Sequence, residues 1–400
     1  MKTPEERLAR LLDRHPEFYA VAPDDPTGAI IRRGELLVPA LHAGAVEQST
    51  RRWTDKRTDL EPLGLTRFTL HRDTDVADLI ANQFSPAGKD ALAAPIHMFR
   101  GEPNYQGGPG GVPAPVTPAP PAPGKGSSAH AVTVTVMDTG LAAGHPWFPH
   151  RSWERIDVGV DHDVEDRLDS NNDYELDAQA GHGTFIAGIV RQHAPGAKLR
   201  VGRVLGSDGV CDEIELLQAL LSLRGRSPKG NKGTGVLNLS LGAYTWNDRP
   251  PTLLSHAIEQ LGPDTVVVAA AGNNSSDRVF WPAAFEHVVA VGALTADGSQ
   301  PAAFSNHGSW VDAWAPGQDV ASSFVTFDGP AEDAPGADID PDCFSGYAQW
   351  SGTSFAAPRV AAELARRAQE DKVSARAVLA EVVGEFSAAG GATTSRSGGP

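Results

Sequence analysis

The distribution of apolar residues changes along the chain, and its clearest pattern begins near residue 129. From there, short continuous runs of β-branched and aliphatic residues alternate with stretches of helical spacing. The runs span residues 132–137, 199–205, 235–241, 265–271 and 287–294, and the helical stretches span residues 184–192, 212–223 and 253–260. Continuous apolar runs are typical of strands buried on both faces. The pattern predicts an α/β fold over residues 129–386, with a doubly wound, mostly parallel sheet and helices on both faces.

The first hundred residues show a different and weaker pattern. Thr3, Pro4 and Glu6 suit the cap, the first turn and the capping box of a helix. Strand-like runs follow at residues 29–31, 35–38 and 65–70, with helical stretches at residues 42–53 and 75–83. Strands and helices mixed in this way predict a small α+β domain over residues 1–100.

A change of composition separates the two regions. Between residues 101 and 128, 15 of 28 residues are Gly or Pro. Such a segment cannot build a core, so it is interpreted as a partly extended linker. At the other end, residues 387–400 are rich in Gly, Ser and Thr and are predicted to be a disordered tail.

The negative charge lies almost entirely on the second region. The formal net charge is −16, of which the first hundred residues contribute −1. An acidic chain lacks the positive surface that binds nucleic acid or an anionic membrane. Two cysteines, Cys211 and Cys343, exclude a disulfide-rich scaffold but leave a single bridge open.

Two further observations concern the setting in which the chain works. No apolar run approaches the roughly 18 residues that a membrane span requires. The N-terminal sequence MKTPEERLARLLDRHPEF lacks the unbroken apolar core of a secretory signal. A cytoplasmic location is therefore expected.

Four polar residues stand where an open α/β sheet places its ligand site. Asp138 and Asn273 follow predicted strands, and His182 and Ser354 stand at helix starts after glycines. Ligands in such folds bind beyond the carboxyl ends of the strands. Taken singly, each residue has an ordinary explanation as a turn residue, a surface side chain or a helix cap. Together, an acid, an imidazole, a hydroxyl and an amide are the groups that nucleophilic acyl transfer needs.

The sequences around these residues resemble the subtilisin-like serine proteases. Three blocks carry the resemblance: VTVMDTG at residues 134–140, GHGTFIAG at residues 181–188 and GTSFAAP at residues 352–358. Supporting blocks are NLSLG at residues 238–242, AAAGN at residues 269–273 and VDAWAPG at residues 311–317. The order Asp, His, Ser along the chain is also the order of the subtilisins. The resemblance implies a subtilisin-like catalytic domain over about residues 129–386.

The resemblance also implies a role for each of the four residues. Ser354 would be the nucleophile, His182 its general base and later the acid, and Asp138 would orient the imidazole and stabilise its charged form. Asn273 would form an oxyanion hole with the backbone N–H of Ser354. No cofactor is required for this chemistry.

Substrate binding, by the same resemblance, adds a polypeptide strand between two backbone segments. One segment is Ser240, Leu241 and Gly242, the other is Gly209, Val210 and Cys211, and Ala271 and Gly272 would border a side-chain pocket. Cys211 departs from the small or polar residue usual there. It is either an inert thiol or a group that narrows a subsite and makes the enzyme sensitive to thiol reagents.

Two acidic insertions depart from the family pattern. Residues 161–177 read DHDVEDRLDSNNDYELD and precede His182. They could hold calcium through carboxylate oxygens, or form a solvated acidic loop. Residues 327–344 form a second acidic segment before Ser354, which would either cover the cleft or form a surface loop. Acid near the cleft suggests a preference for basic peptides that weakens with salt.

The activity expected from these features is that of a serine endopeptidase with a polypeptide substrate. A dedicated peptide maturase, which removes a leader or cyclises its product, is the alternative within the same chemistry, and a catalytically dead peptide-binding protein is a third. In this family an α+β prodomain commonly precedes the catalytic domain as chaperone and inhibitor. Residues 1–100 resemble such a prodomain, or form a module that recruits substrates.

Overall fold

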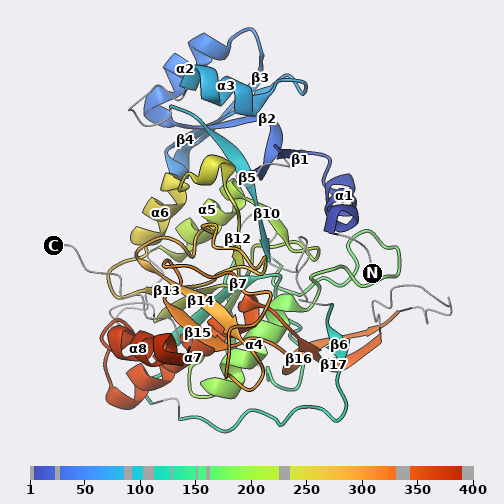
Figure 1. The fold of residues 1–400 in the computed structure, drawn as a ribbon, viewed down its shortest axis with the longest axis vertical. Helices are drawn as coiled ribbons and strands as arrows, with labels where there is room; N and C mark the ends of the chain where they lie inside the picture. The colour runs from blue at the N-terminus through green and yellow to red at the C-terminus, as the bar shows by residue number, and fades with distance from the viewer. Residues whose placement is uncertain are drawn as a thin grey trace.

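In the part of the chain that the structure describes, seven parallel strands form the central sheet of the second region. The computed structural model describes residues 4–22, 28–84, 92–101, 112–127, 129–149, 152–158, 163–224, 235–329 and 343–389 (Figure 1). The strand order is β15-β14-β13-β11-β7-β9-β8, and every neighbouring pair is parallel. The strands are β7 (Thr133–Asp138), β8 (Trp153–Arg155), β9 (Lys198–Arg203), β11 (Val236–Leu239), β13 (Val266–Ala270), β14 (Val288–Leu294) and β15 (Ala313–Pro316). The predicted α/β fold with a mostly parallel sheet is confirmed.

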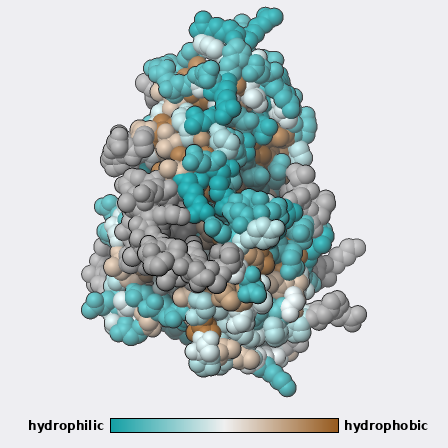
Figure 2. All heavy atoms as spheres, turned by 90° about the vertical axis from the view of Figure 1, so that its right-hand side faces the viewer, coloured by the Kyte–Doolittle hydropathy of each residue, from teal (hydrophilic) through white to brown (hydrophobic). Residues whose placement is uncertain are grey.

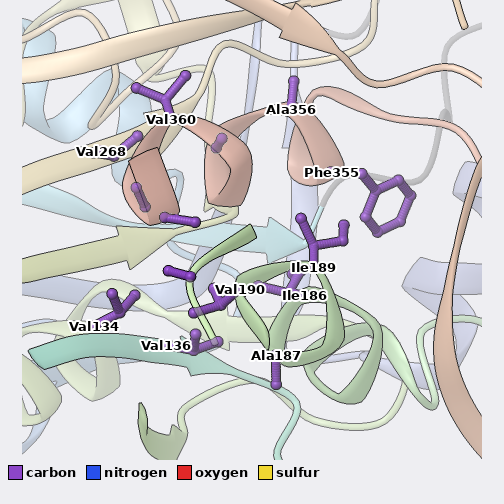
Figure 3. Close-up of a cluster of buried hydrophobic side chains, with 14 of the residues drawn as sticks. Val134, Val136, Ile186, Ala187, Ile189, Val190, Val268, Phe355, Ala356 and Val360 are labelled. Atoms are coloured by element: carbon purple, nitrogen blue, oxygen red, sulfur yellow. The ribbon is translucent and has the colours of Figure 1, made fainter. Parts of the chain in front are cut away.

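Helices cover both faces of this sheet, which explains why its strands are apolar throughout. The helices are α4 (His182–His193) and α7 (Thr353–Asp371) on one face, α5 (Glu213–Leu223) and α6 (Thr252–Glu259) on the other, and α8 (Leu379–Ala389) beside β15. Successive residues of β13 point to opposite faces, so that Val268 joins the core under α4 and α7, and Val267 the core under α5 and α6. Figure 3 shows side chains of β7, α4 and α7 meeting in the first of these cores.

The N-terminal residues form a second, antiparallel sheet. Its path is β5-β2-β4-β3, with β1 paired to β2. The elements are α1 (Pro4–Arg14), β1 (Phe18–Val21), β2 (Ala29–Pro39), α2 (Ala43–Thr50), β3 (Thr54–Leu60), β4 (Leu65–Leu70), α3 (Val76–Leu79) and β5 (Ala94–Gly101). The helices α2 and α3 bury Val46 and Val76 in a small core with Phe68 of β4. From β2 to β5 this is a β-α-β-β-α-β arrangement, here called the N-terminal module.

Several sequence predictions for this module need correction. The two strands expected at residues 29–31 and 35–38 are one strand, β2, which bends at Gly34 with a φ of 60° and a shift of register against β5. The strands β1, β3 and β5 were not predicted. β3 reads TDKRTDL and lies at the open edge of the sheet, where charged side chains face solvent and protect the edge from pairing.

The Gly/Pro-rich segment is anchored at both of its described ends. Gly101 belongs to β5, so the segment begins one residue later than predicted. Residues 102–111 lie outside the described part. Farther on, β6 (Ala114–Pro115) pairs with β17 (Cys343–Trp350), which forms a hairpin with β16 (Val320–Asp328). Residues 116–127 then run as an extended segment along the lower edge of the molecule (Figure 1).

Three remaining expectations concern the chain end, the cysteines and membranes. Helix α8 continues to Ala389, so the predicted disordered tail is wrong for residues 387–389, because the Ser387 hydroxyl bonds within the helix to Val383 and across to Asp312. Residues 390–400 lie outside the described part. Cys211 and Cys343 are both free thiols. No helix among the described residues has both the length and the apolar character to span a membrane.

Candidate active site

The carboxyl end of β7 and the first turn of α4 bring an acid and an imidazole together. Asp138 is the last residue of β7, and its Oδ1 lies 2.7 Å from Nδ1 of His182, the first residue of α4. Both side chains are completely buried. The same Oδ1 accepts the backbone N–H of Thr139, and the Thr139 hydroxyl accepts the N–H of Gly183. The acid therefore holds the imidazole by Nδ1, which leaves Nε2 as the nitrogen available for proton transfer.

Glycines on both sides of His182 allow this close approach. Gly181 has a φ of 82°, a conformation that favours glycine, and it turns the chain into α4. Gly183 lies so close to the β7 turn that a Cβ would sit 2.4 Å from the carbonyl oxygen of Gly140. A side chain on Gly183 would push α4 away from the β7 turn and lengthen the contact between His182 and Asp138, and a Cβ on Gly181 would lie 2.4 Å from the Phe324 ring.

Aromatic rings enclose the imidazole on the side away from Asp138. The Trp350 ring meets it edge-on at 5.5 Å between centroids, and the Phe355 ring lies 5.4 Å away. Within the described part of the chain, the buried Nε2 of His182 has no hydrogen-bond partner. An unpartnered nitrogen in an apolar enclosure is costly, and a substrate or a hydroxyl proton would satisfy it.

Ser354 stands in the first turn of α7 and is fully buried. Its hydroxyl is directed at the carbonyl of Ser240 at 3.4 Å and not at His182. Pro358 has no N–H and cannot bond the Ser354 carbonyl four residues earlier. The Ser240 hydroxyl donates to that carbonyl instead, at 2.8 Å. Because Pro358 leaves the Ser354 carbonyl without a bond inside the helix, this carbonyl bonds to Ser240, the residue directly before β12 (Leu241–Gly242).

Asn273 is held by one end of its amide. Its Oδ1 accepts both the backbone N–H and the hydroxyl of Thr353, each at 2.8 Å. The Thr353 hydroxyl also accepts the N–H of Gly272 at 3.0 Å. With Oδ1 fixed in this way, Nδ2 is the donor end of the amide, and it lies on the side of Gly352, where an added Cβ would be 3.4 Å from it. The amide donor is therefore placed next to the turn that carries Ser354.

The segment before Asn273 packs inside the protein, and its expected place beside a side-chain pocket stays a prediction. Ala271 is fully buried, and its carbonyl accepts Nδ2 of Asn306 at 2.8 Å. Gly272 has a φ of 96°, and a Cβ there would lie 2.5 Å from the same amide. Asn306 also accepts the backbone N–H groups of Asn274 and Ser276. This amide supports the Asn273 turn, and no feature of the sequence pattern singled it out.

The two backbone segments expected to bind a substrate strand are paired with the protein's own β5. β10 (Val210–Asp212) and β12 (Leu241–Gly242) lie antiparallel on either side of β5. Phe99 pairs with Cys211, Arg100 with both Val210 and Gly242, and Gly101 with Leu241. The Gly101 N–H donates to Gly209 O at 2.9 Å.

β5 leads from the N-terminal module down into the second region (Figure 1). A Cβ on Gly101 would lie 3.4 Å from Cε1 of His182. The strand therefore ends beside the imidazole. The sequence carried one signal for it, the apolar residues Ile96, Met98 and Phe99 directly before the Gly/Pro-rich segment.

Cys211 is shielded in this arrangement. It is 2% exposed and packs in the core with Phe99 and Ile214. Burial, together with the neighbouring carboxylates of Glu215 and Asp212, raises the pKa of the thiol well above its ordinary value. A thiol that stays protonated is unreactive, so the alternative of a thiol-sensitive residue does not fit this arrangement.

The first acidic segment is only partly a solvated loop. Asp166 is buried, and it accepts the Gly181 N–H at 3.0 Å and the Thr184 hydroxyl at 2.7 Å, both at the start of α4. Burial raises its pKa, and the charge of Asp138 adds to the increase. The expectation of a solvated loop is therefore wrong for this residue, because its carboxylate replaces the missing hydrogen-bond partners of the helix start.

Asp177 is the second buried carboxylate of that segment. It accepts hydrogen bonds from Ser170 and Ser207 and forms an ion pair with Arg14 of α1. Burial alone would raise its pKa, but the bonds from Ser170, Ser207 and Arg14 hold the pKa below its ordinary value.

The described carboxylates of the first acidic segment do not gather around a point at which a cation could bind. Asp169 and Asp173 accept backbone N–H groups of their own loop. Among the residues that the structure covers, no group of three or more His, Cys, Asp or Glu side chains is placed to hold a metal ion. Residues 161 and 162, and most of the second acidic segment, lie outside that part. Calcium binding stays a prediction.

Contacts between charged or polar side chains join the N-terminal residues to carboxylates of the second region. The contacts are Arg14 with Asp177 and Asp208, His15 with Asp208 at 2.6 Å, Arg32 with Asp212 at 2.9 Å and His97 with Glu213 at 3.0 Å. A small apolar contact of Leu11 and Phe18 with Met98 and Val210 accompanies them. Hydrophilic side chains dominate the face that carries α1, with hydrophobic atoms in scattered patches (Figure 2).

Comparisons with known proteins agree with this architecture. The model of the family described as "Subtilase family" matches residues 129–394. The chain is 34% identical over 248 residues to "Thermophilic serine proteinase" of Bacillus sp. (strain AK1), a match that covers 59% of this chain and 51% of that protein. It is 31% identical over 253 residues to "Subtilisin BL" of Lederbergia lenta, covering 61% of this chain and 78% of that one. The chain thus spans about half the length of the Bacillus relative.

A solved structure was also found, that of "a cold adapted subtilisin-like serine proteinase". It aligns with a TM-score of 0.48 at 25% identity, and the alignment covers 66% of this chain and 84% of the other.

Proposed function

Because the chain belongs to the subtilase family, we propose that it is a serine endopeptidase that hydrolyses polypeptides through an acyl-enzyme. The observation that carries the proposal is the buried pair of Asp138 and His182, whose Nε2 has no partner among the described residues and whose ring lies 5.4 Å from that of Phe355, the residue after Ser354. A purely structural histidine would have both of its nitrogens satisfied, since a buried polar atom without a partner lowers stability.

The proposed mechanism gives each of these groups one task. The Ser354 hydroxyl rotates from the Ser240 carbonyl to His182 Nε2 and attacks the peptide carbonyl, while Nε2 takes its proton. Asp138 fixes the proton of Nδ1 and stabilises the imidazolium. The imidazolium then gives its proton to the leaving amine, and water repeats the sequence to release the acid and restore Ser354.

The negative charge of the tetrahedral intermediate needs fixed donors. Nδ2 of Asn273 and the backbone N–H of Ser354 are the two candidates, and Thr353 holds the amide in place through Oδ1. Ser354 also stands in the first turn of a helix of 19 residues, whose N-terminal dipole favours an anion. A rigid amide loses no energy by reorienting during the reaction.

We also propose that residues 1–101 act as a prodomain that occupies the substrate cleft. β5 lies between β10 and β12 as an added antiparallel strand, the mode by which an extended peptide binds to a sheet edge. Its last residue reaches His182. A polypeptide substrate would take the same place after β5 has left, and self-cleavage would fall in residues 102–128.

The test uses Ser354→Ala beside Ser351→Ala, a matched change three residues earlier at a half-buried position whose hydroxyl accepts the N–H of Asp319. After incubation alone, the wild-type chain and Ser351→Ala should react with a fluorophosphonate, cleave an unfolded protein and show a new N-terminus beyond residue 101. Ser354→Ala should do none of these and stay intact, because it lacks the attacking oxygen. Labelling that persists in Ser354→Ala would contradict the nucleophile, and an intact chain in active enzyme would contradict the prodomain.

A further inference from the structure

The strand β5, which lies between β10 and β12, makes a polar side-chain contact with the first residue of α5. His97 of β5 lies directly before Met98, the residue that pairs with Asp212. Its Nδ1 lies 3.0 Å from Oε2 of Glu213, and its backbone N–H donates to the same oxygen at 3.4 Å. Glu213 is 3% exposed. Glu213 therefore contacts His97 through both the backbone and the side chain of that residue.

The imidazole satisfies Glu213 only in part. The backbone N–H of Trp246 donates to Nε2 of His97 at 3.3 Å, so Nε2 carries no proton and Nδ1 carries one. His97 thus offers a donor to the carboxylate but no positive charge. A lysine or arginine in the same place would offer both.

Glu213 also lies in a concentration of negative charge. It is the first residue of α5, next to the capping residue Asp212, and Glu215 follows in the same turn. Asp212 accepts the N–H of Glu215, and Glu215 accepts the N–H of Asp212 at 2.7 Å, so these two carboxylates are committed to the helix start. Arg32 of the N-terminal module lies on Asp212 at 2.9 Å. When the module leaves, Asp212 loses its cation and Glu213 loses both of its donors.

A substrate strand in the place of β5 would bury Glu213 again, and a buried carboxylate without a partner is strongly destabilised. The adjoining positions of the strand cannot relieve it, because Met98 and Phe99 both pack among apolar side chains. The position of His97 brings its side chain to within 3.0 Å of the Glu213 carboxylate. The position lies four residues before that of Gly101, the residue beside His182.

We propose that Glu213 is a specificity-determining residue that selects polypeptide substrates with lysine or arginine at the position held by His97. The inference rests on the proposed function, since it assumes that a substrate lies in the cleft as β5 does. The general preference for basic peptides expected from the sequence is thereby assigned to one position of the substrate and to one carboxylate of the protein, that of Glu213.

The experiment uses the full chain after self-processing, with active sites titrated by a fluorophosphonate. The substrates are synthetic peptides with the sequence of residues 92–115 that carry Lys, Gln or Glu in place of His97, and mass spectrometry locates the cut. We expect kcat/KM to fall in the order Lys, Gln, Glu, by about tenfold from Lys to Glu, the effect of one charge-assisted hydrogen bond. In Glu213→Gln the ratio of Lys to Glu should fall below about twofold.

Two controls keep the outcome decisive. Fluorophosphonate titration and circular dichroism should give the same values for wild type and Glu213→Gln, which shows that the variant is folded. Glu259→Gln changes an exposed carboxylate of α6 and should keep the full preference. Equal kcat/KM for the Lys and Glu peptides in wild type, or a preference that survives in Glu213→Gln, overturns the inference while leaving the proposed function intact. Cleavage of no peptide by titrated enzyme would instead overturn the proposed function.

Discussion

Two contacts of the second region differ in the forces that hold them. The helices α4 and α7 meet the central sheet through side chains that are wholly apolar and buried, such as Phe185, Val268 and Val360. The N-terminal residues meet the same region through one paired strand, a small apolar patch and a set of ion pairs. Burial of apolar surface depends little on salt or pH, whereas ionic contacts depend on both. The first contact is permanent, and the second can be undone by its surroundings.

The contact between the N-terminal residues and the second region has positive side chains on one side and negative side chains on the other. Every arginine–carboxylate pair found between residues 4–101 and the described part of the second region places the arginine on the N-terminal side and the carboxylate on the other side. The residues beyond the first hundred carry a net charge of −15. Some of their carboxylates therefore form the surface on which the N-terminal residues dock.

The largest effect should come from the apolar contact. Phe185 is completely buried in α4, and its ring packs 4.5 Å from that of Phe355. In a Ser354→Ala background, which prevents self-digestion, Phe185→Ala should lower the free energy of unfolding by about 3–5 kcal/mol, because it leaves a cavity. Urea unfolding followed by circular dichroism measures this. A loss below about 1 kcal/mol would show that this core can collapse and that the comparison is mistaken.

A smaller effect is expected from the ionic contact. Arg14→Glu, in the same background, places a like charge against Asp177, whose side chain is 1% exposed, and against Asp208. Loss of this charged hydrogen bond should weaken docking by about 2 kcal/mol and leave global unfolding nearly unchanged. Hydrogen exchange of the β5 amides should accelerate by about thirtyfold.

The matched control for this change is Arg10→Glu in the same helix. Arg10 and Glu175 are each about half exposed, so their pair contributes little. Exchange of β5 should stay within about twofold of the parent chain. If the two reversals accelerate exchange equally, the effect belongs to the charge of α1 as a whole and not to the buried pair.

The smallest effect should be that of pH on the same contact. Burial alone would lower the pKa of His15, but the hydrogen bond and charge of Asp208, with a smaller part from Glu17, raise it above its ordinary value. A raised pKa means that docking is strongest below about pH 6.5 and is lost as pH rises through the raised value. Exchange of β5, corrected for its intrinsic rate, should accelerate severalfold between pH 6 and pH 9. His15→Gln should flatten the profile, and protection that grows with pH would contradict this.

The fold of the second region could be predicted because its strands are buried on both faces. A run such as residues 266–271 has no polar residue to confuse its interpretation, and the turns after β7 and β13 carry conspicuous residues at their ends. The positions of Asp138, His182, Asn273 and Ser354 at one edge follow from the same rule. Their catalytic roles stay predictions.

The remaining features depended on contacts that no local pattern records. β5 is half His, Arg, Gly and Pro by sequence, and it becomes a strand because β10 and β12 pair with it from distant parts of the chain. Asp166 and Asp169 belong to the same acidic run, yet the first is buried under α4 and the second faces its own loop. Sequence gives the charge of such residues but not the partner that buries one of them. The cytoplasmic location also stays a prediction.

The pairing of β6 with β17 has a consequence for any cut in the segment between the two regions. Gly101 is held between β10 and β12, and Ala114 is held by β17. A break in residues 102–111 would therefore leave both new ends in sheets, the first in the cleft and the second on the hairpin. Nicking and release become separate events, so a cleaved chain can remain one particle whose dissociation, and not its cleavage, sets when the cleft opens.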